Sequence, residues 1–265
     1  MRKLFFGLLL LTNACSGIVK KPDVFNIKKL AIVGIQTNQG IYSTGEIDRG
    51  FTFFSFPVFL GKGAVEPLML PQIPATGGFR LVDFGLNTFE EELGKIRGWQ
   101  VVPAIKVVGS PAYKEFSKTI QNIPGRSVAS ELISNWYSPQ GMTPIGDQNK
   151  VLKKDTMKEI QKIASQLGLD AVVFVDMDLA YAPDHSINMG AFASVASSLK
   201  VIAKTGAIVV STPEVKNGSG ERYFSDTSSP GLGKQLVFND EIEAMYKAAI
   251  QKSAASLREK INKEL

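Results

Sequence analysis

The most regular pattern of apolar and polar positions lies around residues 163–181, IASQLGLDAVVFVDMDLAY. Before and within it, apolar residues recur at a helical period, at Met157, Ile160, Ile163, Ala164 and Leu167. Gly168 follows, as expected for a left-handed residue that ends a helix. Residues 171–175 then form an unbroken apolar run too short for a helix. We therefore expect a central strand that is covered on both faces.

Shorter patterns predict further strands. Residues 28–35, KKLAIVGI, form the first, and residues 79–84 form a short one. Residues 99–108, WQVVPAIKVV, form another, in which Pro103 indicates an edge or a bulge. Residues 198–203 and 207–212 flank Lys204-Thr205-Gly206, which predicts a hairpin.

Helices are expected between these strands. Thr88 and Glu91 have the spacing of a capping box, which predicts a short helix ending near Gly98. Two helical stretches, 111–122 and 127–136, are split by a Pro-Gly pair, and Asp155 or Thr156 is expected to cap the helix before Gly168. A final helix starts at Asp240 with Glu243, and its apolar stripe is Ile242, Met245, Tyr246, Ala249, Ile250, Leu257 and Ile261.

The remaining segments are rich in turn-forming residues. We expect an irregular insertion at 37–78, a link at 138–149, a short connection at 182–197 and a loop at 217–234. There is no internal repeat. The mixture of strands and helices predicts an α/β (α+β) fold with a mixed β-sheet packed by helices.

The amino terminus has the pattern of an export signal. Arg2 and Lys3 precede the apolar run 4–11, LFFGLLLL, and small residues lead to Cys15. A membrane-spanning helix needs about 20 residues to cross a ~30 Å hydrocarbon core, and this run is too short for that. We expect residues 1–14 to be a signal peptide that is removed.

Cys15 is the only cysteine, so the chain cannot form an intramolecular disulfide. Its position directly after Ala14 resembles the lipobox of bacterial lipoproteins, with Thr12 at the place usually held by leucine. The resemblance implies that Cys15 carries diacylglycerol and an amide-linked acyl chain, which attach the protein to the membrane. Ser16, in place of aspartate, implies by the same resemblance the outer membrane. The alternative is an ordinary secretory signal followed by a chance cysteine.

We expect a lipidated cysteine and tether at 15–27 and a single domain at 28–265. Within it, residues 30–35, 99–103, 168–175 and 201–210 resemble, in this order, the curli-secretion lipoprotein family and the related TolB amino-terminal-like domains. The resemblance implies a non-catalytic interaction or assembly module at the periplasmic or surface face of the outer membrane. Its partner would be an unidentified envelope protein or a second copy of the chain.

The net charge of +5 is spread along the chain. The densest basic group is Lys150, Lys153, Lys154, Lys158 and Lys162, which we interpret as a solvated helix face. A nucleic-acid-binding protein would concentrate its positive charge on one surface. We therefore expect no nucleic-acid partner.

Candidate chemistry is sparse. Asp176-Met177-Asp178 resembles the metal-binding motif of nucleotide-sugar glycosyltransferases, and strand alternation would place both carboxylates on one face. We favour instead the solvated end of a strand. His185, the sole histidine, lies in a predicted loop, and the segment 231–234, GLGK, lacks the rest of a phosphate loop. We expect no catalytic residue, metal or cofactor.

The most aromatic stretch is residues 51–60, FTFFSFPVFL. Both faces of a strand here would be apolar, and Pro57 disfavours a central position. The stretch is either core or an interface formed by Phe51, Phe53, Phe54, Phe56 and Phe59. Two further functions stay open, a surface lipoprotein that binds host or environmental ligands and a divalent-metal-dependent glycosyltransferase-like enzyme.

Overall fold

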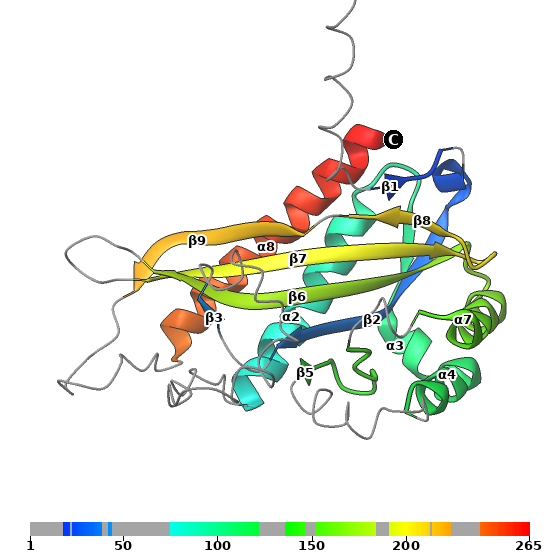
Figure 1. Cartoon of the computed structure of the whole chain (residues 1–265), viewed down its shortest axis with the longest axis horizontal. Helices are drawn as coiled ribbons and strands as arrows, with labels where there is room; N and C mark the ends of the chain where they lie inside the picture. Colours follow the sequence, from blue (N-terminus) through cyan, green and yellow to red (C-terminus); the bar gives the residue numbers. More distant parts are fainter. Residues whose placement is uncertain are drawn as a thin grey trace, which may run out of the picture.

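The computed structural model describes residues 18–21, 23–38, 42–43, 75–121, 136–146, 152–183, 191–212, 214–223 and 239–265. In this part of the chain, a nine-stranded mixed sheet is packed by helices (Figure 1). The predicted α+β class with a mixed sheet is therefore confirmed.

The sheet has the strand order β1-β8-β7-β6-β2-β4. β3 joins it beside β6, β5 beside β2 and β9 beside β7. The strands are β1 (Ile18–Val19), β2 (Lys29–Asn38), β3 (Tyr42–Ser43), β4 (Gln100–Val102), β5 (Trp136–Tyr137), β6 (Ala171–Pro183), β7 (Ala191–Ala203), β8 (Ile208–Ser211) and β9 (Val215–Tyr223).

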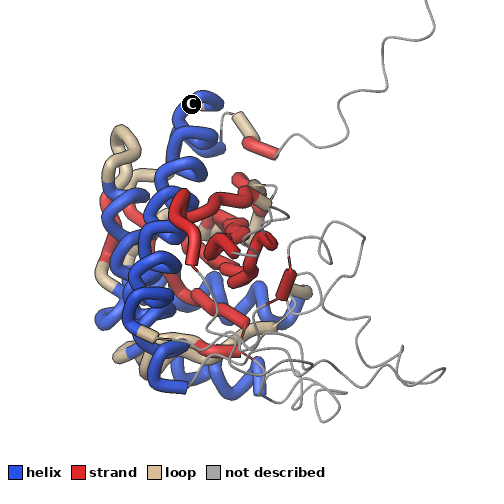
Figure 2. Tube along the Cα trace, turned by 90° about the vertical axis from the view of Figure 1, so that its left-hand side faces the viewer, coloured by secondary structure: helices blue, strands red, loops and turns tan. Residues whose placement is uncertain are grey.

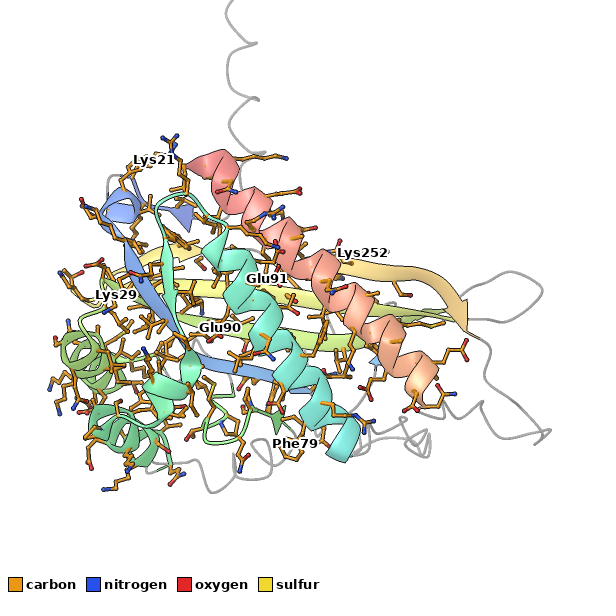
Figure 3. The ribbon with its side chains drawn as sticks, turned by 180° about the vertical axis from the view of Figure 1, so that it is seen from behind. Lys21, Lys29, Phe79, Glu90, Glu91 and Lys252 are labelled. Atoms are coloured by element: carbon orange, nitrogen blue, oxygen red, sulfur yellow. The ribbon has the colours of Figure 1, made fainter. Side chains whose placement is uncertain are left out.

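Helices cover both faces of the sheet. They are η1 (Asp23–Asn26), α2 (Ala75–Gly94), α3 (Ala104–Val108), α4 (Pro111–Gln121), α7 (Lys154–Leu167) and α8 (Asp240–Glu264). Figure 3 shows α2 and α8 side by side across one face, and Figure 2 shows the helix that ends at the carboxyl terminus, α8, on one side of the strands. On the other face, the Phe116 ring of α4 lies 6.2 Å from the Phe174 ring of β6.

The central strand is confirmed. β6 pairs in parallel with β2 over residues 171–177, and it pairs in antiparallel with β7 along its whole length. Residues 171–175 are all buried, which explains the unbroken apolar run. Gly168 has φ 59°, and the Leu169 amide donates to the Ala164 carbonyl, 2.8 Å away, so the helix ends as predicted. The hairpin between β7 and β8 also forms, with Gly206 at φ 87°.

The final helix is confirmed, and every member of its predicted stripe is buried. The buried Tyr246 hydroxyl donates to the Ala180 carbonyl, 2.9 Å away, which fixes α8 against β6. Its cap is Asn239, one residue before the predicted start, because the Asn239 side chain accepts from the Ile242 amide. In α7 neither Asp155 nor Thr156 caps the helix, since both lie inside it after Lys153.

The predicted strand 79–84 and the capping box at Thr88 are wrong. Both lie inside α2, where the Thr88 hydroxyl donates to the Phe84 carbonyl one turn back. Glycines concealed this helix because they weaken the propensity signal. They are required by packing: a Cβ at Gly78 would lie 2.1 Å from the Tyr137 ring, and one at Gly85 would lie 2.6 Å from the Met177 methyl.

The predicted strand 99–108 is correct only for Gln100–Val102, because α3 begins directly after Pro103. The Glu90 carboxylate of α2 accepts from the Ala104 amide at 2.7 Å and so satisfies a free donor at the start of α3. Helix α4 forms as predicted. Residues 127–135 of the next predicted helix lie outside the described residues, and Trp136 begins β5 instead of ending a helix.

The described residues of two predicted connections, 182–197 and 217–234, belong to strands. β6 extends to Pro183, β7 begins at Ala191, and β9 occupies Val215–Tyr223. The polar sequence of β9 is stabilised by α8, whose Lys252 ammonium donates to the Gly218 and Ser219 carbonyls and whose Ser253 hydroxyl donates to the Val215 carbonyl. These contacts cannot be read from local sequence, and they cover an edge that would otherwise expose free carbonyls.

The expected tether is wrong for residues 18–27. Ile18 and Val19 pair with β8, and Val24 and Ile27 are buried. The expected insertion also begins later, since Thr37 and Asn38 belong to β2. No helix among the described residues is long and apolar enough to cross a membrane.

Candidate functional site

The densest polar group on the sheet lies where β2 runs beside β6. The Gln36 amide group donates to the Gly146 carbonyl at 2.7 Å and to the Asp176 carboxylate at 2.8 Å. Its oxygen accepts from the Ile145 and Gly146 amides. Gln36 therefore ties the 138–146 link to the sheet and uses its full hydrogen-bonding capacity.

Asn38 extends the ladder between the same two strands. Its buried side chain accepts from the Leu179 amide at 2.6 Å and donates to the Leu179 carbonyl at 2.8 Å. The Asn38 side-chain amide thus makes the two hydrogen bonds to Leu179 that the backbone of a neighbouring strand would otherwise make. Further along, β3 resumes the pairing with Ala180 and Tyr181.

Asp176 and Asp178 lie two residues apart within the continuous strand β6, on one face of the sheet, as the sequence predicts. The interpretation as a solvated strand end is wrong, because β6 continues to Pro183. One Asp178 carboxylate oxygen is buried, with no hydrogen-bond partner in the described part of the molecule. Burial, followed by the charges of Asp176 and Glu214, raises the pKa of Asp178 from 3.8 to about 8.

Asp176 and Asp178 offer few ligands for a divalent metal ion. No group of three histidine, cysteine, aspartate or glutamate side chains that could hold a metal ion is present among the described residues. Asp178 would also have to release its proton before it could bind a cation. The raised pKa of Asp178 instead makes the stability of the fold depend on pH.

Most sites considered from the sequence fall outside the described residues. These are Cys15, Phe51, Phe53, Phe54, Phe56, Phe59, His185 and residues 231–234. The basic helix is described: Lys158 pairs with Asp155 at 3.5 Å, and Lys162 pairs with Glu159 at 2.7 Å. Lys158 and Lys162 are both exposed, which agrees with the interpretation of a solvated helix face, whereas the Glu159 side chain is only 14% exposed.

Three large apolar side chains are exposed in the described part of the chain: Phe25 at 54%, Phe79 at 47% and Ile105 at 76%. Phe79, in the first turns of α2, packs against Tyr137 of β5 with 5.1 Å between the ring centroids. Neither Phe25 nor Phe79 stands out as a surface feature in the sequence, because Phe25 lies in a segment expected to be a tether and Phe79 in a segment expected to be a strand.

Phe25 belongs to what we call the amino-terminal surface, formed by Lys20, Lys21, Phe25 and Lys28, all exposed. Figure 3 shows Lys21 beside the carboxyl-terminal end of α8, whereas Phe79 lies at the opposite end of the molecule, where α2 begins. The chain therefore exposes aromatic residues at two well-separated ends.

Neither a protein-family model nor a curated protein matches the sequence. Among solved structures, the chain is similar to the lipoprotein GNA1162 from Neisseria meningitidis, at 14% identity over 86% of this chain and 98% of that one, with a TM-score of 0.31. It is similar to the hypothetical protein CT253 from Chlamydia trachomatis, at 11% identity over 89% and 98% of the two chains, with a TM-score of 0.32. It is also similar to the LpoB C-terminal domain from Salmonella enterica, at 12% identity over 78% and 85%, with a TM-score of 0.23. At these identities and TM-scores, the likenesses carry no inference about function.

Proposed function

We propose that the chain is a bacterial envelope lipoprotein, exported by residues 1–14 and anchored through acyl chains on Cys15. The observation that carries this proposal is the position of the only cysteine directly after a basic, apolar and small-residue segment. Ser16 supports the outer membrane as the location, on its periplasmic or surface face.

The fold supports an anchor at this position. Only Ser16 and Gly17 separate Cys15 from the first residue of β1. Three chain steps of at most ~3.6 Å span roughly 11 Å. Under the proposal, the folded domain is therefore held directly against the membrane and not on a long tether.

We further propose that the domain is a non-catalytic interaction or assembly module. Phe79 and Tyr137 form an aromatic contact at the end of the molecule opposite Lys21, where the Phe79 ring stays half exposed. The aromatic residues 51–60 precede the same helix in the sequence. An exposed apolar group of this kind suits a contact with an envelope protein or a second copy.

A glycosyltransferase-like activity remains a weaker candidate, since it depends on Asp176 and Asp178 alone. A buried acid with a raised pKa is sometimes part of an active site. Here the same acid is explained by its place inside a paired strand.

The anchor is tested with Cys15→Ser in the full chain. The unaltered protein should enter the detergent phase on phase partition and incorporate labelled palmitate, and the variant should do neither. Cys15→Ser that still enters the detergent phase would show that the attachment lies elsewhere.

The interaction surface is tested with the pair Phe54→Asp and Phe56→Asp. If these residues form an interface, circular dichroism stays native while self-association or cross-linking to the envelope partner is lost. If they are core, the fold is lost because unpaired buried carboxylates are costly. Loss of the fold therefore contradicts the interface.

A further inference from the structure

We infer that the amino-terminal surface docks on an anionic lipid bilayer, with Phe25 entering the headgroup region and Lys20, Lys21 and Lys28 facing lipid phosphates. This inference rests on the proposed lipid anchor at Cys15. It goes beyond that anchor because it assigns one face of the folded domain to the membrane and so fixes the orientation of the whole molecule.

The topology places these residues together. β1 runs antiparallel to β8, and the Lys20 amide continues the pairing by donating to the Val209 carbonyl at 2.8 Å. The chain then passes through η1 to the start of β2, where the Lys28 and Lys29 amides donate to the Asp170 carboxylate. Lys20, Lys21, Phe25 and Lys28 therefore lie on one short crossing at the end of the sheet where β2 begins.

Phe25 is held in its exposed position by its neighbours. Val24 and Ile27 on either side of it are buried in the core, and the Val24 amide donates to the Lys20 carbonyl at 3.1 Å. The Phe25 side chain, which is 54% exposed, is therefore held at the surface between two buried residues. A fixed, exposed phenylalanine between lysines is typical of residues at a membrane interface.

The positive charge of the amino-terminal surface also favours an anionic lipid bilayer as its partner. Between Ile18 and Lys28 there are three lysines and a single acidic residue, Asp23. All three lysines are exposed. Basic residues beside a membrane anchor are attracted to anionic headgroups, and a second contact of this kind strengthens the attachment of an acylated protein.

The length of chain before the fold favours a membrane over another partner. With Cys15 three residues from Ile18, an acylated cysteine brings β1 within about 11 Å of the lipid. Lys20 and Lys21 follow directly after β1. A protein partner at this surface would have to enter the narrow space between the domain and the bilayer.

The test uses the full lipidated chain and a fluorescent probe beside Phe25. Since the Cys15 thiol is consumed as a thioether under the proposed function, Asn26→Cys provides a single free thiol on exposed η1. Asp83→Cys, exposed on α2 one turn from Phe79, provides the distant control. Each is labelled with an environment-sensitive fluorophore and reconstituted in vesicles of phosphatidylglycerol and brominated phosphatidylcholine.

Docking predicts that brominated lipid quenches the probe at residue 26 and leaves the probe at residue 83 unquenched. Adding Phe25→Ser, or Lys20→Glu with Lys21→Glu, should reduce quenching at residue 26 below its level in the chain that carries Asn26→Cys alone, and unchanged quenching in both variants would contradict the docking. The matched change Ile105→Ser, at another exposed apolar side chain, should leave it unaltered. High salt should weaken the quenching because it screens lysine–phosphate attraction.

Two further results would overturn the inference: one contradicts the docking alone, and the other contradicts the lipid anchor as well. If the chain floats with the vesicles but the probe at residue 26 is quenched no more than the probe at residue 83, the anchor stands and the docking is wrong. If the unaltered chain does not float and its Cys15 thiol takes the label, the anchor itself is absent and the docking fails with it.

Discussion

Asp178→Asn should stabilise the protein at neutral and alkaline pH. Burial, together with the charges of Asp176 and Glu214, raises the pKa of Asp178 from 3.8 to about 8 in the folded chain. In the unfolded chain the carboxyl returns to its ordinary pKa. Between these values the folded state keeps a proton that the unfolded state releases, so ionisation favours unfolding increasingly as the pH rises.

The size of the effect follows from the two pKa values. Each pKa unit corresponds to about 1.4 kcal/mol, so a shift from 3.8 to about 8 sets a ceiling of roughly 6 kcal/mol above pH 8. The side chain is half-buried, so local rearrangement can hydrate it and reduce this cost. Below about pH 4 the effect vanishes because both states are protonated.

Urea unfolding, followed by circular dichroism at pH values from about 4 to about 9, measures the difference. The advantage of Asp178→Asn should grow as the pH rises and level off above about pH 8. Asp155→Asn is the matched control for the loss of an aspartate, since the Asp155 side chain is 88% exposed. Parallel stability curves for Asp178→Asn and the unaltered chain would refute the reasoning.

Three further changes test how the sheet is held. Asn38→Leu leaves the buried Leu179 amide and carbonyl without their side-chain partners. It should lower the free energy of unfolding, measured in urea, by about 2–4 kcal/mol. A loss below about 1 kcal/mol would contradict the two hydrogen bonds between Asn38 and Leu179. Gly78→Ala places a Cβ against the Tyr137 ring and should lower the free energy of unfolding by about 1–3 kcal/mol. Gly94→Ala is the control and should be close to neutral, because its Cβ would meet only Val101 at 3.9 Å. Equal effects of the two changes would contradict the close contact between α2 and Tyr137 of β5. Tyr246→Phe removes the hydroxyl that donates to the Ala180 carbonyl and should lower the melting temperature, at a cost of about 1 kcal/mol, and an unchanged melting temperature would argue against this bond.

The sequence predicts elements well where apolar periodicity and an end signal coincide. Gly168 after a helical stripe, and Gly206 between two apolar runs, are examples, because one backbone conformation satisfies both the local residue and the core. Prediction fails where tertiary contacts override local preference. The glycines of α2 lower its predicted helix propensity, although close packing against Tyr137 and Met177 leaves no room for a side chain at Gly78 and Gly85. The polar strand β9 is stabilised by hydrogen bonds from Lys252 and Ser253 of α8.

The candidate site, too, is predicted in part by local sequence and depends in part on tertiary contacts. Strand alternation correctly places Asp176 and Asp178 on one face, but it cannot show that β6 continues past them and buries one Asp178 carboxylate oxygen. Phe25 was missed because a polar, proline-containing segment concealed two buried positions, Val24 and Ile27, that hold it in place. Interactions across long sequence separations decide both cases.

Mass spectrometry of the amino-terminal peptide from protein purified out of membranes tests the central claim most directly. Cleavage after Lys20 should release a peptide of residues 15–20 that begins at Cys15 and carries diacylglycerol on its sulfur and an acyl chain on its amine. A peptide with an unmodified Cys15, or a chain that begins at another residue, would contradict the account.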